Sequence, residues 1–287
     1  MVSTHLIIVP CHGIWKGRNP RDRDNWHLAP FQIEGNDHIC FIEHLSTAYS
    51  ELEADPAAFM IISGGETKRE AGEIAEATTY HQLLNDLSLI DSNKDTKTNK
   101  DLVGGEFKSI QSRIATEVYA RDSFENVLFS MCRFYELHKR YPTKITITGF
   151  EFKSYRFTQL HLLQALAFNL DNVVYLGNQP NPSHLSTEAK QKYFKELDHS
   201  EKQHAANVFA QDWYGIGPNL KSKKLKRNPF AKKHSYAITN PYITNFLNEI
   251  ADDVKKPKSN QEIKRILLQS APWTIERITQ STQLHQE

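Results

Sequence analysis

The sequence contains little cysteine and no long hydrophobic run. Its three cysteines, Cys11, Cys40 and Cys132, lie far apart and form no C-x-x-C pair. This spacing argues against a disulfide framework or a cysteine-rich zinc site and favours a reducing compartment. The apolar stretch before Pro10 is much shorter than a signal peptide or a membrane span requires. We therefore expect a cytoplasmic protein that does not bind membranes.

The sequence also lacks an excess of charge of either sign. A net charge of +1 gives no overall bias toward nucleic acid or an anionic membrane, so any argument from charge must be local. At 287 residues the chain can bury about three quarters of its unfolded surface. It therefore needs neither a disulfide nor a metal to hold a core.

Short β-branched runs alternate with helical spacing over the first 180 or so residues. The apolar runs are "HLIIVP" from His5, "AFMIIS" from Ala58, a short run through Val118, "KITITG" from Lys144 and "NVVYLG" from Asn172. Continuous apolar runs of this kind are typical of strands buried on both faces of a parallel sheet. The alternation predicts a Rossmann-like three-layer αβα sandwich with a mainly parallel sheet.

The remaining third of the chain is predicted to be helical. We expect an α/β domain over residues 1–185 and a helical extension over 186–287 that packs against it. The extension should contain a helix from Thr187 to about Gln211, a basic loop at 221–234 and two terminal helices. The polar segment 91–101 cannot bury enough apolar surface to offset its ordering entropy and is predicted to be a mobile insertion.

Ligands of parallel sheets bind beyond the carboxyl ends of the strands. Gly64 and Gly65 follow the second strand, where they let the backbone approach a phosphate or carboxylate, and the next helix offers unpaired N–H groups. A tight structural turn explains the two glycines equally well. His12, after the first strand, is expected to contact the ligand. Cys11 is the weaker nucleophile candidate, because neighbouring residues at a strand end point to opposite sides.

Glu125 and Asn126 lie in the first turn of a predicted helix and are the catalytic candidates. Glu125 would be a general base or metal ligand, and Asn126 would orient it. The spacing of Asp122 and Glu125 is that of a capping box, so Glu125 could instead serve only the helix end, with Asp122 or Ser123 as the N-cap.

Two further acids, Glu76 and Glu117, are expected to support this site or to bind a metal. Carboxylate and amide oxygens suit a Mg²⁺-type ion.

Positive charge gathers at two places. Lys153 and Arg156 lie three residues apart at a helix start, where cations oppose the helix dipole unless an anion offsets them. This favours an anion site over a solvated surface. A basic run such as 221–234 is usually a solvated loop, a nuclear address or a polyanion patch. The ring side chains around this one favour an ordered flap that folds its positive charge over the strand edge. Nucleic acid is the less favoured partner, because no recognised binding module accompanies the run.

The ordered set of loop residues resembles the SanA, ElyC and YdcF-like α/β proteins, in their soluble eukaryotic branch. The matching positions are Ser63-Gly64-Gly65, Glu76-Ala77, Glu117, Ser123-x-Glu125-Asn126, and Thr148 with Arg156. The family histidine between Thr148 and Arg156 is replaced here by Phe152 or Lys153. The resemblance implies a Rossmann-like fold, a pocket at the strand ends in which Ser123 joins the ligand-binding residues, and S-adenosylmethionine as a ligand suggested for the family.

The leading hypothesis is an enzyme, a hydrolase or transferase, that acts on a small anionic metabolite, phosphorylated or nucleotide-like. A competing hypothesis is a sensor or binding protein that uses the same pocket without turnover, which the replaced histidine supports. A third is an adaptor that binds nucleic acid or an acidic partner through Lys223, Lys224, Lys226 and Arg227.

Overall fold

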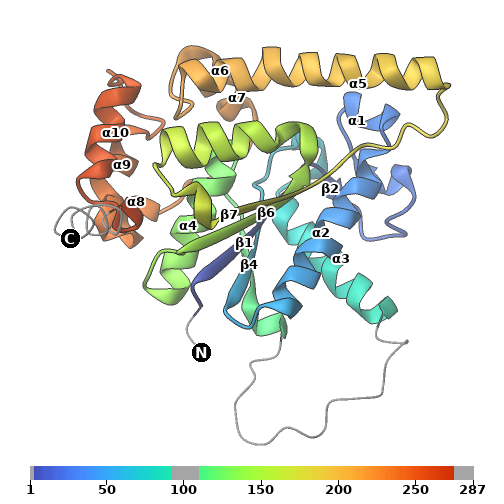
Figure 1. The fold of residues 1–287 in the computed structure, drawn as a ribbon, viewed down its shortest axis with the longest axis horizontal. Helices are drawn as coiled ribbons and strands as arrows, with labels where there is room; N and C mark the ends of the chain where they lie inside the picture. Colours follow the sequence, from blue (N-terminus) through green and yellow to red (C-terminus); the bar gives the residue numbers. More distant parts are fainter. Residues whose placement is uncertain (1–2, 92–109, 275–287) are drawn as a thin grey trace, which may run out of the picture.

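A computed structural model describes residues 3–91 and 110–274 (Figure 1). The segment predicted to be a mobile insertion lies outside the described residues, apart from Asp91. Cys11, Cys40 and Cys132 are all buried free thiols. Within the described ranges, no helix is long and apolar enough to cross a bilayer.

The fold is built on one sheet of five parallel strands, which confirms the predicted fold class. The strands are β1 (His5–Pro10), β4 (Ala58–Ser63), β5 (Ile114–Glu117), β6 (Lys144–Phe150) and β7 (Val173–Asn178). Their order is β5-β4-β1-β6-β7, and in the register Ile8 lies between Ile61 and Ile147. The chain builds outward from β1 in one direction, then crosses back to β6. The strand order therefore reverses between β1 and β6, where α/β sheets bind ligands.

Helices cover both faces of the sheet (Figure 1). Helices α2 (Asp37–Ala54) and α3 (Glu76–Asp91) pack against one face, while α4 (Ser123–His138) and the π-helix η5 (Arg156–Ala165) pack against the other. The side chains of β1 divide between the two cores because successive residues point to opposite faces. Both sets are fully buried, so the continuous apolar run seen in the sequence is required.

The C-terminal region is helical and shares the core on the α4 side. Its helices are α5 (Thr187–Glu201), the π-helix η7 (Lys202–Ala206), α6 (Asn207–Gln211), α7 (Pro218–Lys226), α8 (Tyr236–Thr239), α9 (Thr244–Glu249) and α10 (Asn260–Leu268). Phe246 and Ile263 belong to the same buried cluster as Leu6 of the central strand. The helical region thus packs directly on the sheet layer. The division into two domains stays a prediction.

Two local predictions were wrong. The helix expected directly after Gly65 begins only at Glu76, after a loop that contains a short 3-10 turn. The basic segment expected to be a loop is partly helical, because α7 begins with Pro218 at its first position and buries Leu220 against the core.

The polar stretch after β1 also contains regular structure. The antiparallel pair β2 (Ile14–Trp15) and β3 (Trp26–His27) precedes the short helix α1 (Phe31–Glu34). Two buried tryptophans hold this pair against α2 and α3.

Candidate functional site

A pocket of about 280 Å³ lies at the carboxyl edge of the sheet, at the reversal of strand order. We name it the edge pocket. Its floor comes from Cys11 and His12 after β1 and from Gly64 after β4, and one wall comes from Lys153 and Arg156 after β6. The other lining residues are Ala29, Phe31, Gln32, Thr67, Lys68, Glu76, Ala120, Arg121, Asp122, Ser123, Asn126, Phe157 and Arg227.

The structure brings most of the predicted site residues together in this pocket. Those that line it are His12, Gly64, Glu76, Ser123, Asn126, Lys153 and Arg156. Gly65, Glu117 and Glu125 are not among the lining residues. Sequence reasoning did not place Lys68 or Asp122 in the site, and no local pattern marks them as ligand contacts. It expected the basic run to fold over the strand edge without singling out Arg227, which lines the pocket.

The two glycines use their N–H groups within the protein. Gly64 donates to the carbonyl of Glu117 at 3.0 Å, and Gly65 donates to the carbonyl of Ala120 at 2.8 Å. A Cβ on Gly64 would lie 2.8 Å from the Cβ of Cys11, closer than real side chains approach. In this structure the glycines therefore permit close packing of the loops, and they are not free donors to a ligand.

The N–H groups at the N-terminus of helix α3 are also hydrogen-bonded within the protein. The N–H groups of Glu76 and Ala77 donate to the carbonyls of Gly65 and Gly64, at 3.0 and 3.1 Å. The unpaired amides expected after the glycines are therefore occupied here.

A buried hydrogen-bond cluster joins three of the predicted residues to the strand ends beneath the pocket. Glu117 accepts from Ser63 Oγ at 2.8 Å, from the N–H of Tyr119 at 2.7 Å, and from the hydroxyl of Tyr236 at 3.1 Å. Asn126 Nδ2 donates to the carbonyl of Ser63 at 2.9 Å. Burial raises the pKa of Glu117 to about 7, although these hydrogen bonds oppose the rise. The cluster ties β4, β5, α4 and α8 into one unit.

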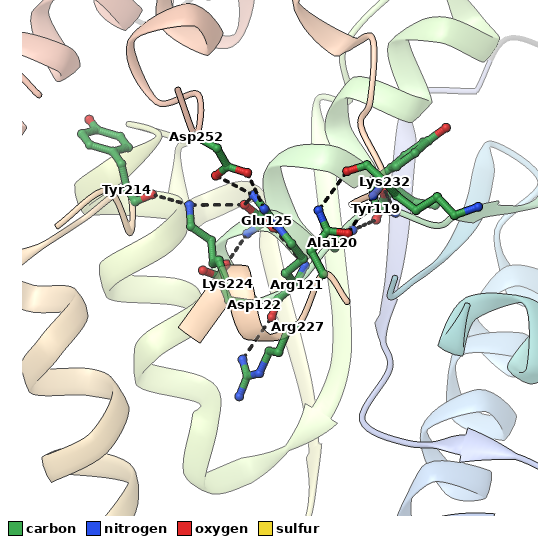
Figure 2. Close-up of polar contacts among 12 residues, drawn as sticks. Tyr119, Ala120, Arg121, Asp122, Glu125, Tyr214, Lys224, Arg227, Lys232 and Asp252 are labelled. Atoms are coloured by element: carbon green, nitrogen blue, oxygen red, sulfur yellow. Dashed lines mark hydrogen bonds and ion pairs between the residues drawn. The ribbon is translucent and has the colours of Figure 1, made fainter. Parts of the chain in front are cut away.

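Glu125 lies on the far side of the turn that precedes α4, in an ion-pair network with the buried side chains of Arg121 and Lys224 and the exposed Asp252 (Figure 2). Arg121 donates to Glu125 from its backbone N–H at 2.9 Å, from Nε at 3.0 Å and from Nη2 at 2.7 Å. Lys224 Nζ lies 3.3 Å from the same carboxylate, and Arg121 also pairs with Asp252. We name these four residues the ion-pair network.

The network holds Glu125 in its charged form. Burial alone would raise the pKa of Glu125, but Lys224 and Arg121 outweigh it and hold the pKa below its ordinary value. The predicted N-cap is confirmed as Asp122, whose Oδ1 accepts from the N–H of Glu125 at 2.9 Å. The Glu125 side chain bonds to the N–H of Arg121 instead of that of Asp122. Its carboxylate is thus occupied by cations of the protein itself.

Several cations of the edge pocket are not paired in this way. Within the part of the chain that the structure describes, Lys68, Lys153 and Arg227 have no carboxylate at ion-pair distance. Arg227 comes from the end of α7 and donates to the carbonyl of Arg121 at 3.0 Å. The ammonium of Lys153 lies 4.8 Å from the centre of the Phe150 ring. Burial, followed by the charge of Arg156, lowers the pKa of Lys153 to about 8.

Arg156, like Arg121, is a cation of the pocket lining that is paired with a carboxylate. Its Nη2 donates to Glu201 Oε2 at 3.2 Å, and its Nε lies 2.8 Å from Oε1, outside hydrogen-bonding geometry. Glu201 is the last residue of the long helix α5, which crosses the top of the view in Figure 1. The helical extension therefore supplies the carboxylate that neutralises Arg156.

His12 is a neutral imidazole on the pocket floor. Burial, then the charge of Lys153, holds its pKa well below the ordinary value. Its ring stacks on Phe150 with centroids 5.5 Å apart, and Gln32 Nε2 donates to its carbonyl at 2.9 Å. The buried Nε2 of His12 has no hydrogen-bond partner among residues 3–91 and 110–274. That atom is free to meet a ligand.

Two acids complete the lining. Burial raises the pKa of Glu76 and of Asp122. Thr67 donates its hydroxyl to Glu76, whereas Oδ2 of Asp122 is buried and meets no partner in the described chain. No cluster of three or more His, Cys, Asp or Glu side chains that could hold a metal was found among the described residues. The predicted metal candidates Glu76, Glu117 and Glu125 are accordingly not gathered into one group.

A serine and a histidine meet at the pocket wall. Ser123 Oγ lies 2.8 Å from Nε2 of His161, which comes from η5. His161 is fully buried. Only the tertiary structure places it against Ser123.

A protein of similar sequence occurs in yeast. The chain is 36% identical to the "Uncharacterized protein YOR238W" of Saccharomyces cerevisiae over 264 residues, which cover 82% of this chain and 87% of the yeast protein. No family model matches the chain, and no solved structure matches it. The extent and identity of the yeast match show that the chain belongs to the family of YOR238W.

Proposed function

We propose that the edge pocket binds a small anionic metabolite, phosphorylated or nucleotide-like, and that the protein is a hydrolase or transferase acting on it. The observation that carries this proposal is the group of three cations, Lys68, Lys153 and Arg227, that line the pocket without a carboxylate partner in the described chain. Like charges that share a pocket repel each other, and a bound anion relieves that repulsion.

The shape of the pocket supports a ligand of this class. Its volume of about 280 Å³ is near the lower end of the range of ligand pockets, which suits a small metabolite. Ser123 is the first residue of helix α4 and lines the pocket, and a helix N-terminus favours an anion, although Asp122 Oδ1 already accepts from the N–H of Glu125. Phe31, on the lining, is 75% exposed and offers an apolar face to the organic part of a ligand.

The ionisable groups of the pocket favour an enzyme over a protein that only binds the ligand. His12, Glu76, Asp122 and Lys153 all have shifted pKa values, and such groups concentrate in active sites. The sensor alternative keeps one argument, since the family histidine before Arg156 is replaced here. Product formation in a substrate screen separates the two.

The adaptor alternative is less well supported, because much of the basic segment contacts the protein itself. Lys224 is buried against Glu125, and Lys232 pairs with Glu66 at 3.5 Å and Glu73 at 3.2 Å. These contacts occupy charges that an acidic partner or nucleic acid would need. The cytoplasmic location expected from the sequence stays a prediction.

We also propose that the YOR238W family is a branch of the SanA, ElyC and YdcF-like proteins. Three parts of the motif that carries the resemblance, at Ser63, Glu117 and Asn126, form one buried hydrogen-bond cluster. A cluster of this kind requires these residue types together. S-adenosylmethionine therefore belongs among the ligands to be tested.

The proposal is tested by thermal shift and calorimetry on the full-length protein. Inorganic phosphate, nucleotides, sugar phosphates and S-adenosylmethionine are tried with and without Mg²⁺. Ligand at 100 times its dissociation constant should add about 2.7 kcal/mol of stability, which raises the melting temperature by several degrees.

The variants Lys153→Ala and Arg227→Ala should each weaken binding about tenfold or more, since a hydrogen bond to a charged group contributes about 1.5–3 kcal/mol. Lys226→Ala is the matched control, because Lys226 is exposed beside Arg227 and does not line the pocket. The proposal fails if no compound stabilises the protein, or if Lys226→Ala weakens binding as much as Arg227→Ala.

A further inference from the structure

The hydroxyl of Ser123 does not cap helix α4. The N-cap is Asp122, whose Oδ1 accepts from the N–H of Glu125 at 2.9 Å. Ser123 is the next residue, its side chain lines the edge pocket, and its Oγ lies 2.8 Å from Nε2 of His161. A serine at hydrogen-bond distance from an imidazole, on the wall of a ligand pocket, is the arrangement of an activated nucleophile.

His161 is held in one orientation by apolar neighbours. It is fully buried, and its ring lies 5.8 Å from that of Phe124, 5.7 Å from that of Phe157 and 4.6 Å from that of Phe209. Its Nδ1 has no hydrogen-bond partner among the described residues, so these rings, and not an acid, fix the imidazole. His161 also belongs to a π-helix, a feature that is frequent at functional sites.

The cations of the pocket supply what phosphoryl transfer requires. Lys153, Arg156 and Arg227 line the same pocket as Ser123. Enzymes that transfer a phosphoryl group act mainly by positioning it and by stabilising the charge on its peripheral oxygens. The pocket thus combines a hydroxyl beside an imidazole with several positive side chains around it.

We propose, building on the anion site proposed above, that Ser123 is a nucleophile that accepts a phosphoryl group and that His161 is its general base. In the first step Oγ forms a bond to phosphorus while the bond from phosphorus to the leaving oxygen breaks. The hydroxyl proton passes to Nε2 of His161. The leaving oxygen departs with the electron pair of its bond and takes a proton from bulk water.

The second step restores the enzyme. Water attacks the phosphorus of the phosphoserine, Oγ leaves with its electron pair, and Oγ recovers the proton from His161. The two protons of the water leave with inorganic phosphate. An acceptor hydroxyl in place of water makes the same cycle a transferase reaction.

Substrate binding itself prepares the base. Burial, followed by the charge of Arg156, holds the pKa of His161 well below its ordinary value, so the free protein carries a neutral imidazole. A phosphorylated substrate beside Arg156 adds negative charge near His161 and makes the imidazole easier to protonate. The base is therefore strongest when the substrate is present.

The test uses p-nitrophenyl phosphate, whose leaving group needs no protonation, on the full-length protein with and without Mg²⁺. We expect release of p-nitrophenolate and a phosphoryl adduct on Ser123, located by peptide mass spectrometry of acid-quenched samples. Ser123→Ala should abolish both signals. His161→Gln should slow adduct formation about 10²- to 10⁴-fold and flatten its pH profile.

Ser130→Ala is the matched control. Ser130 lies on the same helix, its hydroxyl is buried, and its Oγ meets no partner among the described side chains. This variant should keep the wild-type rate. Melting temperatures and the affinity for inorganic phosphate are measured for every variant, which shows whether each protein is folded and retains the anion site.

The outcomes separate this inference from the proposed function. Wild-type protein that binds inorganic phosphate but forms no adduct and releases no p-nitrophenolate overturns the role of Ser123 and leaves the anion site standing. An adduct on another residue, or acylation of Ser123 by p-nitrophenyl acetate without phosphorylation, overturns the phosphoryl assignment. If neither inorganic phosphate nor p-nitrophenyl phosphate binds, both proposals fail.

Discussion

The turn from Arg121 to Asn126 separates two charged regions that use the same residue types in different ways. On one side, the ion-pair network joins two cations to two carboxylates (Figure 2). On the other, the edge pocket gathers Lys68, Lys153 and Arg227, which have no carboxylate side chain at ion-pair distance in the described chain. Arg121 borders both regions, and Arg156 is paired with Glu201. The two regions contain the same residue types and differ in whether their charged side chains are paired.

Lys224 and Lys153 illustrate this difference in pairing. Burial opposes the charge of both, but Glu125 and Asp122 outweigh it for Lys224, so the pKa of that lysine is raised. Lys153 faces Arg156 and has no bound carboxylate, and its pKa falls to about 8. Removal of one partner of a buried pair leaves the other charge uncompensated, whereas an unpaired cation on a pocket wall is available to an anionic ligand.

The largest expected effect comes from breaking the ion-pair network. Glu125→Gln leaves Arg121 and Lys224 without their shared carboxylate and should lower the free energy of unfolding by about 3–5 kcal/mol. Urea denaturation measures this. Glu196→Gln, at an exposed pair on α5, should change it by less than about 0.5 kcal/mol. A loss below about 1 kcal/mol for Glu125→Gln would mean that the network does not hold the turn in place.

Gly64→Ala tests whether Gly64 is needed for close packing at the pocket floor. Its Cβ would lie 2.8 Å from that of Cys11 and 3.1 Å from that of Glu76, so we expect a loss of about 1–3 kcal/mol in unfolding free energy. Gly13→Ala is the comparison, because its Cβ would meet its neighbours at 3.3 Å or more and should cost less. Equal stability of the two variants would contradict the packing role.

The pH dependence of anion binding should report on Lys153. With a pKa of about 8, Lys153 is charged below that pH and neutral above it. The affinity for inorganic phosphate is therefore expected to be full below pH 8 and to fall about tenfold as pH rises above it. Calorimetry at pH values on either side of 8 measures the change. Lys153→Arg keeps its charge throughout, so its affinity should stay level; a parallel fall would assign the titration to another group.

The smallest effect concerns Arg156, whose carboxylate partner comes from the helical extension. Glu201→Gln releases Arg156 from its carboxylate, so Glu201 no longer competes with phosphate for that guanidinium, and phosphate affinity should rise by up to about fivefold, which corresponds to about 1 kcal/mol. Glu196→Gln on the same helix again serves as control, with no change in affinity expected. Weaker binding in Glu201→Gln would show that the pair positions Arg156 for the ligand.

Local patterns were sufficient where a structure depends on nearby residues. The five strands follow from apolar runs, and the cap of α4 follows from the spacing of Asp122 and Glu125. Local reasoning failed where a long-range partner decides. The N-terminus of α3 is held by the carbonyls of Gly64 and Gly65, across the loop that precedes the helix. The charged form of Glu125 is held by Lys224, about a hundred residues away.

The sequence by itself determined the parallel α/β sheet and brought His12, Lys153 and Arg156 to one edge of it, because alternation and strand ends are local properties. Only the tertiary structure decided which charges are paired. It buried Glu125 between two cations, brought Arg227 to the pocket and set His161 against Ser123. Electrostatic and hydrogen-bond partners are set by distance in space, and distant segments of the chain supply them.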